Sequence, residues 1–178
     1  METKAVMTSS ALVELLRLFE QAAIPVWLDG GWGVDALLER QTRTHKDVDI
    51  ILPVADVPQL QEILAHWRGF AFKEGKPPDS FVLADGAGLE VDVHAATFDG
   101  DGNGVYRMQN GEDWIYTAEG LAGRGVVGGF SVRCLSPLEQ VRCHAYGYVP
   151  TEKDFRDMEL LRERFGVELP PQLRRSVS

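Results

Sequence analysis

The stretch Trp27–Ile50, WLDGGWGVDALLERQTRTHKDVDI, decides how the rest of the chain is interpreted. It begins within a short apolar segment, Ile24–Leu28, which has the length and composition of a strand. Asp29 and a glycine pair interrupt that strand, and the apolar residues that follow recur with the period of a helix. Between a strand and a helix, glycine brings the backbone close to a phosphate, and the first helical N–H groups attract the anion. The predicted phosphate cradle consists of Gly30, Gly31 and Trp32.

Two aspartates lie one residue apart near the end of this stretch. The segment Lys46–Val54 alternates charged and aliphatic residues before it becomes continuously apolar, which is typical of a strand with one face in a wet cleft. Asp47 and Asp49 therefore share one face of the strand. Two carboxylates several ångströms apart can hold one or two Mg²⁺ ions together with substrate phosphates. We predict that both aspartates are metal ligands.

A third carboxylate is expected from a later strand, Leu89–Phe98. Its polar residues Glu90, Asp92 and His94 alternate with apolar ones and share one face. We select Asp92 as the third acidic residue of the site, with Glu90 as the reserve. A glycine turn or a pair of aspartates alone is usually a simple turn or a solvated face. Their combination puts charge where a sheet should be half buried, which favours a site for metal and phosphate.

The outer parts of the chain predict helices around a small sheet. A helix capped by Ser9 or Ser10 should end before Pro25, and another should run from Asp56 to Gly69. Two capping boxes predict two closing helices. The fold class is therefore α+β, a small mixed sheet with helices packed on it. We expect a catalytic domain over residues 1–135 and a helical segment over 136–178, packed as one unit. Further strands are predicted at Phe70–Lys73, Phe81–Ala84 and Val132–Leu135, and residues 105–131 show no clear pattern.

Composition restricts the partners. The 178 residues include 27 acidic and 18 basic side chains, for a net charge of −9, which disfavours nucleic acid and favours small cationic molecules. No apolar run approaches the ~20 residues of a membrane span, and the first ten residues do not resemble a signal peptide. The two cysteines, Cys134 and Cys143, suit reduced thiols. These features predict a cytoplasmic protein that binds no membrane.

The motifs resemble those of a known superfamily. Gly30-Gly31, Asp47-x-Asp49 and Asp92 are similar to the core of the polymerase-β-like nucleotidyltransferases. The order of WLDGGWGVD, THKDVDI, LEVDVH, FDGDG, YRMQNGEDW and GYVPTEKDFRDMELL resembles the small lincosamide nucleotidyltransferases over nearly the whole chain. The first two motifs also resemble the aminoglycoside nucleotidyltransferases.

The resemblance implies transfer of a nucleoside monophosphate, AMP from ATP, to a hydroxyl of a lincosamide antibiotic, with release of pyrophosphate. It makes Asp47 and Asp49 ligands of Mg²⁺, and Asp92 either a third ligand or the base that takes the hydroxyl proton. It also suggests a homodimer. We predict that Arg43, Lys46 and Lys153 hold the triphosphate. For Asp35, His45 and His94 a structural role is favoured, and for Trp32, Trp114 and Tyr116 core packing is favoured over a drug pocket.

Two alternatives remain open. The charge of −9 suits an aminoglycoside, which is polycationic, at least as well as a lincosamide. A protein of another class, a non-catalytic regulatory module similar to the antitoxin-like members of the superfamily, would also keep the fold.

Overall fold

A mixed sheet with the strand order β1-β2-β5-β4-β3 forms the centre of the structure, a computed structural model that describes residues 5–146 and 148–176. Strands β2 and β5 pair in parallel, and the other neighbours pair antiparallel. Strand β5 also pairs with β6, and β6 with β7. The strands are β1 Trp27–Asp29, β2 Asp47–Pro53, β3 Ala71–Lys76, β4 Ser80–Ala84, β5 Glu90–Phe98, β6 Gly104–Arg107 and β7 Asp113–Tyr116. The predicted α+β fold class is confirmed.

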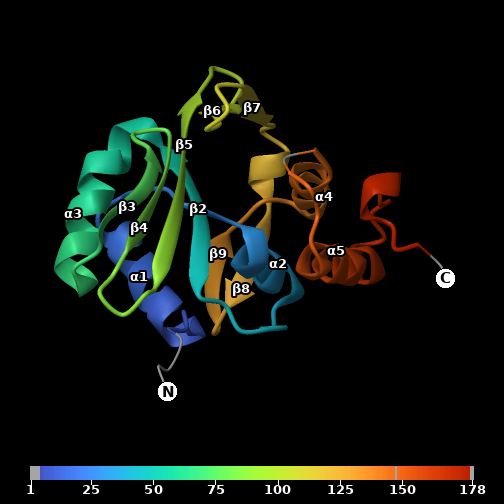
Figure 1. Ribbon diagram of the computed structural model, residues 1–178, viewed down its shortest axis with the longest axis horizontal. Helices are drawn as coiled ribbons and strands as arrows, with labels where there is room; N and C mark the ends of the chain where they lie inside the picture. Colours follow the sequence, from blue (N-terminus) through green and yellow to red (C-terminus); the bar gives the residue numbers. More distant parts are fainter. Residues whose placement is uncertain (1–4, 147, 177–178) are drawn as a thin grey trace.

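Helices flank this sheet at both ends of the molecule. Figure 1 shows α3 beside β3 and β4 at one end of the molecule and α4 and α5 at the other. The α-helices are α1 Ser9–Gln21, α2 Gly30–Leu38, α3 Val57–Arg68, α4 Pro137–Tyr146 and α5 Glu152–Phe165, and short 3₁₀ turns lie at η1 Val54–Asp56, η2 Gly120–Ala122 and η3 Pro171–Leu173. Within the described ranges, none of the helices combines the length and the apolar character that crossing a bilayer requires.

The first helix and strand differ from the prediction in detail. Leu12, Leu15, Leu16 and Phe19 of α1 are buried. Thr8 rather than Ser9 or Ser10 caps the helix, accepting a hydrogen bond from the N–H of Ala11 at 3.2 Å. Strand β1 begins at Trp27, later than predicted. Pro25 offers no N–H for a ladder, so the apolar residues Ile24 and Val26 are buried without forming strand.

The segment without a clear pattern forms three short strands, and a fourth begins at its end. Besides β6 and β7 it contributes β8 Arg124–Val127, and β9 Phe130–Arg133 follows close to the predicted strand. Strands β8 and β9 form a separate antiparallel ribbon. An isolated backbone β-bridge between Cys134 and Leu28 of β1 connects the ribbon to the main sheet. Strands of four residues carry too few alternations to be recognised from sequence.

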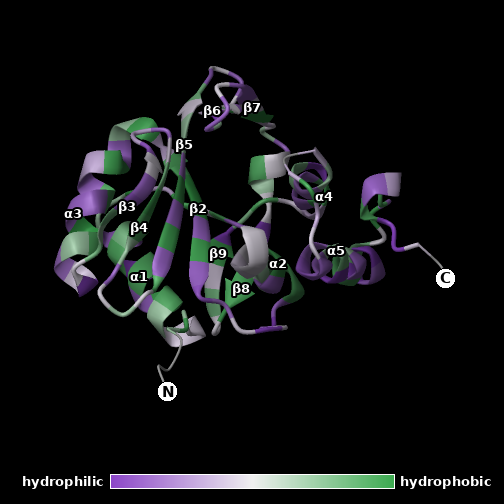
Figure 2. Cartoon of the chain, in the orientation of Figure 1, coloured by the Kyte–Doolittle hydropathy of each residue, from purple (hydrophilic) through white to green (hydrophobic). Residues whose placement is uncertain are grey.

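The parallel pairing of β2 and β5 positions the acidic residues. Val48 and Ile50 of β2 face the core together with Val91 and Val93 of β5, and all four are almost completely buried. The residues between them point to the opposite face, where the sheet is half exposed. Figure 2 shows β2 hydrophilic at its start and hydrophobic toward its end.

The two closing helices pack against α2. Helix α5 begins at the predicted capping box, in which the Asp154 carboxylate accepts from the N–H of Thr151 at 2.7 Å. At α4 half of the predicted box forms: the Ser136 hydroxyl accepts from the N–H of Glu139, whereas the N–H of Ser136 donates to Gly120. Helix α5 buries Met158 and Leu161 and leaves Phe165 exposed. The boundary at residue 135 stays a prediction.

Candidate functional site

Asp49 and Asp92 face each other across the parallel pair at the centre of the sheet. They are register partners of β2 and β5, and Asp47 is in the same way the partner of Glu90. An oxygen of Asp49, an oxygen of Asp92 and a nitrogen of His94 lie within 4.8 Å of one another. The structure therefore brings Asp49 together with Asp92, as predicted, while Asp47 lies at the outer edge of this group.

His94 was assigned a structural role from sequence, yet it lies inside the acidic cluster. Its Nε2 is 3.6 Å from Oδ1 of Asp49 and 3.6 Å from Oδ1 of Asp92. The ring meets that of Tyr106 edge-on, with the ring centres 5.1 Å apart. Its Nδ1 is buried and has no hydrogen-bond partner among the residues that the structure describes. The alternation that placed His94 on the face of Asp92 was the available signal for its position.

Asp29 is a further acidic group that the sequence interpretation passed over. It is the register partner of Asp49 on the antiparallel side, and it caps α2 by accepting a hydrogen bond from the N–H of Gly30 at 2.6 Å. Three neighbouring strands, β1, β2 and β5, thus each place one carboxylate in the same row: Asp29, Asp49 and Asp92. The signal was its position directly before the glycine pair.

Burial and mutual repulsion disturb the ionisation of this row. Burial, reinforced by the charges of Asp49, Asp47 and Asp29, raises the pKa of Asp92 to about 6 in spite of His94. Burial also raises the pKa of Asp29 and of Asp47. Burial works against protonation of His94, but the nearby carboxylates of Asp49 and Asp92 prevail and hold its pKa well above the usual range. Such a set of oxygen donors with unmatched negative charge fits a divalent cation.

The two glycines make room for charged side chains. Gly30 has a φ of +59°, and a Cβ on it would lie 2.2 Å from Oδ2 of Asp49. A Cβ on Gly31 would lie 2.5 Å from a guanidinium nitrogen of Arg43 and 2.6 Å from the ring of His45. The pair therefore lets β2 and the loop before it approach the start of α2. Trp32 is buried, and its ring lies against that of His45 at a tilt of 40°, so only its backbone N–H is available to the predicted cradle.

Arg43 belongs to a paired network beside the glycines. Its Nη2 donates to Asp157 of α5 at 3.0 Å, and its Nη1 lies 3.1 Å from Nδ1 of His45. The other ring nitrogen of His45 lies 2.6 Å from Asp35, which also accepts from Thr42. Asp35, His45 and Asp157 are buried. The structural role predicted for Asp35 and His45 agrees with this geometry, while triphosphate binding by Arg43 stays a prediction.

The two predicted lysines are exposed. Lys46 lies 3.7 Å from Glu90, which also pairs with Lys73. Because two lysines neutralise the charge of Glu90, Asp92 rather than Glu90 supplies the third carboxylate of the acidic row. Lys153 is an exposed residue in the first turn of α5. No contact joins either lysine to the acidic row among the described residues, so their role also stays a prediction.

A pocket of about 470 Å³ opens beside the row. Two acids of the site, Asp29 and Asp92, line it together with His94. Four aromatic side chains also line it: Tyr106, Trp114, Tyr116 and Tyr148. Carboxylates next to aromatic faces suit a cationic ligand with an apolar body. Trp114 and Tyr116 pack in a hydrophobic cluster, as favoured, and also line this pocket, whereas Trp32 does not line it.

Comparison with known proteins decides the family. A family model described as aminoglycoside-2''-adenylyltransferase matches residues 11–161. The chain belongs to the aminoglycoside-2''-adenylyltransferase family. Membership implies a nucleoside triphosphate co-substrate and a divalent metal in general, and it confirms the predicted nucleotidyltransferase.

Similar proteins include both lincosamide and aminoglycoside enzymes. A lincosamide resistance protein of Staphylococcus haemolyticus is 27% identical over 157 residues, which are 87% of this chain and 94% of the relative. The lincomycin-bound crystal structure of lincosamide antibiotic adenylyltransferase LnuA has a TM-score of 0.77 at 25% identity, over 88% of this chain and 98% of that one. The structure of ANT(2'')-Ia with adenylyl-2''-tobramycin shares the fold, with a TM-score of 0.69 at 23% identity over 89% of each chain.

Proposed function

We propose that this chain transfers AMP from ATP, with Mg²⁺, to a hydroxyl of a lincosamide antibiotic and thereby inactivates the drug. The observation that carries the proposal is the row of Asp29, Asp49 and Asp92, of which Asp29 and Asp92 line the pocket with aromatic side chains. The row offers a place for phosphate and metal, and the pocket offers a place for a cationic acceptor. The similarity to lincosamide enzymes over nearly full length supports this acceptor class.

Each group has a proposed part in the reaction. Asp47 and Asp49 hold Mg²⁺, and Asp92 either completes that site or accepts the proton of the attacking hydroxyl. When bound, the metal neutralises charge on the α-phosphate and on the leaving pyrophosphate. The hydroxyl oxygen forms a bond to the α-phosphorus as the bond between that phosphorus and pyrophosphate breaks. A carboxylate of the site accepts the proton of the hydroxyl. A pKa of about 6 suits Asp92 as a base near neutral pH.

Binding groups for the triphosphate complete the proposal. The N–H groups of Gly30, Gly31 and Trp32 point from the start of α2, where the helix dipole favours an anion. Arg43, Lys46 and Lys153 are the proposed basic contacts. The cytoplasmic location and the homodimer stay predictions.

An aminoglycoside is the second candidate acceptor. The matching family model and the net charge of −9 favour it, because a polycationic drug gains from an acidic protein. The two acids in the pocket wall do not distinguish one cationic drug from another.

The test measures pyrophosphate release from MgATP with lincomycin, clindamycin, tobramycin or no acceptor, and mass spectrometry of each product. A nucleotide adduct on a lincosamide supports the proposal. An adduct on tobramycin alone keeps the reaction and replaces the substrate. Tight MgATP binding without release under any condition would overturn the proposed transfer and favour a regulatory module.

A further inference from the structure

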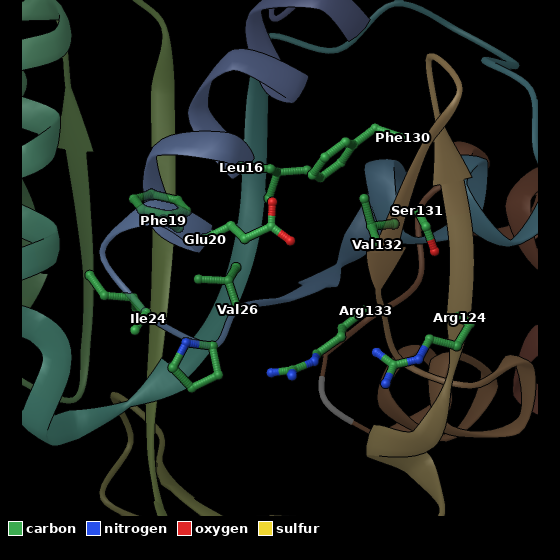
Figure 3. Close-up of a pocket in the computed structure, with 12 residues that line it drawn as sticks. Leu16, Phe19, Glu20, Ile24, Val26, Arg124, Phe130, Ser131, Val132 and Arg133 are labelled. Atoms are coloured by element: carbon green, nitrogen blue, oxygen red, sulfur yellow. The ribbon is translucent and has the colours of Figure 1, made fainter.

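A second hollow lies away from the acidic row, between α1 and the ribbon of β8 and β9. Its volume is about 610 Å³, and it is lined by α1, the segment 23–26 and both strands of the ribbon (Figure 3). This volume lies within the range of pockets that hold small molecules. None of its lining residues belongs to the proposed nucleotidyl transfer site.

The floor of this hollow, called here the ribbon groove, is apolar. Leu16, Phe19, Ile24, Val26 and Val132 line it, and all five are buried in the folded chain. The half-buried Phe130 lies beside Leu16 at one end (Figure 3). A ligand with an aromatic or aliphatic body would therefore cover apolar surface when it enters.

Two arginines form the ribbon side of the groove. Arg124 and Arg133 are direct register partners across β8 and β9, and both are exposed. Among the described residues, neither has an acidic side chain within 4.0 Å, although the protein carries nine more acids than bases. Like charges placed directly opposite each other across a ribbon repel and destabilise it. An anion between the two guanidinium groups would remove that repulsion and accept hydrogen bonds from both.

Aromatic contacts help to hold the basic side chains near the groove. The guanidinium of Arg133 lies over the ring of Trp27, 5.4 Å from its centre. A third arginine, Arg17, lies over the ring of Phe130 at 5.0 Å. These contacts lower the entropy that Arg133 would lose on binding, because its side chain is already partly ordered.

One acid limits the charge of the ligand. Glu20 lies on the α1 wall, and Figure 3 shows its carboxylate directed into the hollow. It would repel a polyanion that extends along the floor, such as a nucleoside triphosphate. A single anionic group at the ribbon end avoids this repulsion.

We propose that the ribbon groove binds a small organic monoanion, with its carboxylate or sulfonate between Arg124 and Arg133 and its aromatic or aliphatic body on the apolar floor. The site is separate from the proposed transfer reaction, and its test does not require turnover.

The first test is a fluorescence titration with 1-anilinonaphthalene-8-sulfonate, an aromatic monosulfonate. In the double variant Arg124→Gln, Arg133→Gln the affinity should fall by about tenfold or more, because two charge-assisted hydrogen bonds are lost. Glu20→Gln should tighten binding. Arg164→Gln, which removes an exposed arginine of α5, is the matched control and should change nothing. Equal affinity in the double variant and the control would overturn the proposal.

Competition and stability give independent readouts. 2-Naphthoate should displace the probe, whereas the neutral 2-naphthamide should not. Without ligand, the double variant should have a higher melting temperature than the parent, because the repulsion across the ribbon is gone, and this also shows that it folds. Displacement by both compounds alike would show a purely apolar groove and contradict the proposed anion site.

Discussion

Two groups of charged side chains flank the glycine pair, and they differ in how their charges are matched. On one side, Arg43 pairs with Asp157 and His45 with Asp35, so positive and negative groups alternate. On the other side, Asp29, Asp49 and Asp92 stand in a row with His94 as their nearby positive partner. The matched group contributes to the fold. The unmatched group is destabilising in the free protein, and a bound cation would relieve it, which is the pattern expected of a functional site.

The largest expected effect comes from removing a charge in the unmatched row. Asp49→Asn should lower the rate of transfer by roughly 10³-fold or more, because a ligand of the proposed metal is lost. If Asp92 is the base, Asp92→Asn should lower the rate of transfer by about 10²–10⁴-fold and leave MgATP binding unchanged. Steady-state rates and MgATP titrations check both variants. Near-normal turnover of Asp49→Asn would contradict the metal assignment, and loss of MgATP binding in Asp92→Asn would make this residue a ligand.

Breaking the matched group should affect stability instead. Arg43→Gln leaves Asp157 buried without its partner, and the expected loss in the free energy of unfolding is about 3 kcal/mol. Urea unfolding measures this loss. Arg107→Gln, which breaks an exposed pair with Asp113, is the control and should leave the free energy of unfolding nearly unchanged, because solvent screens this pair. A raised KM for ATP in Arg43→Gln at unchanged stability would instead support the proposed triphosphate contact.

The turn between the two groups can be tested by adding one carbon. Gly30→Ala combines a left-handed backbone with a clash against Asp49, so it should lower both stability and transfer. Gly69→Ala has a similar φ, +68°, but open space around it, and should cost only about 1 kcal/mol with transfer intact. The comparison separates backbone strain from displacement of Asp49. Equal effects of both substitutions on transfer would show that the contact with Asp49 is unimportant.

The unmatched row also predicts an unusual dependence of stability on pH. Because the pKa of Asp92 is about 6 when folded and near 3.8 when unfolded, the folded state holds the proton more tightly. Its contribution to stability is complete below about 3.8 and is lost as the pH rises through about 6. Without divalent metal, Asp92→Asn should therefore melt at a higher temperature than the parent at pH 8 and lose this advantage near pH 4. A lower melting temperature of the variant at pH 8 would contradict the inference that the charged Asp92 destabilises the folded protein.

The smallest effects are expected at the exposed lysines. Lys46→Gln and Lys153→Gln should each raise the KM for ATP by a few fold, since exposed ion pairs contribute about 0.2–1 kcal/mol. Lys73→Gln, which leaves the other partner of Glu90 in place, is the matched control. An unchanged KM in both lysine variants would remove them from the proposed triphosphate site.

Local patterns were sufficient for the central part of the site. Alternation along two strands predicted the faces of Asp49 and Asp92, and the parallel register then set them opposite each other. It did not predict that Asp29 joins the row, because that depends on the antiparallel pairing of β1 with β2. The partners of Arg43 were equally hidden, since Asp157 is remote in sequence. Contacts between distant segments decide which charges are matched, and local patterns in a single sequence do not reveal those contacts.

The register of β2 with β5 also limits where this chain can change in length. Side chains alternate along a strand, so inserting one residue within 89–92 would turn Asp92 and His94 into the core and bring valines to the site. An insertion in the turn at 77–79 or in the exposed loop at 99–103 leaves that alternation intact. Insertions and deletions among relatives of this chain should therefore gather in those turns and spare the strand that carries Asp92.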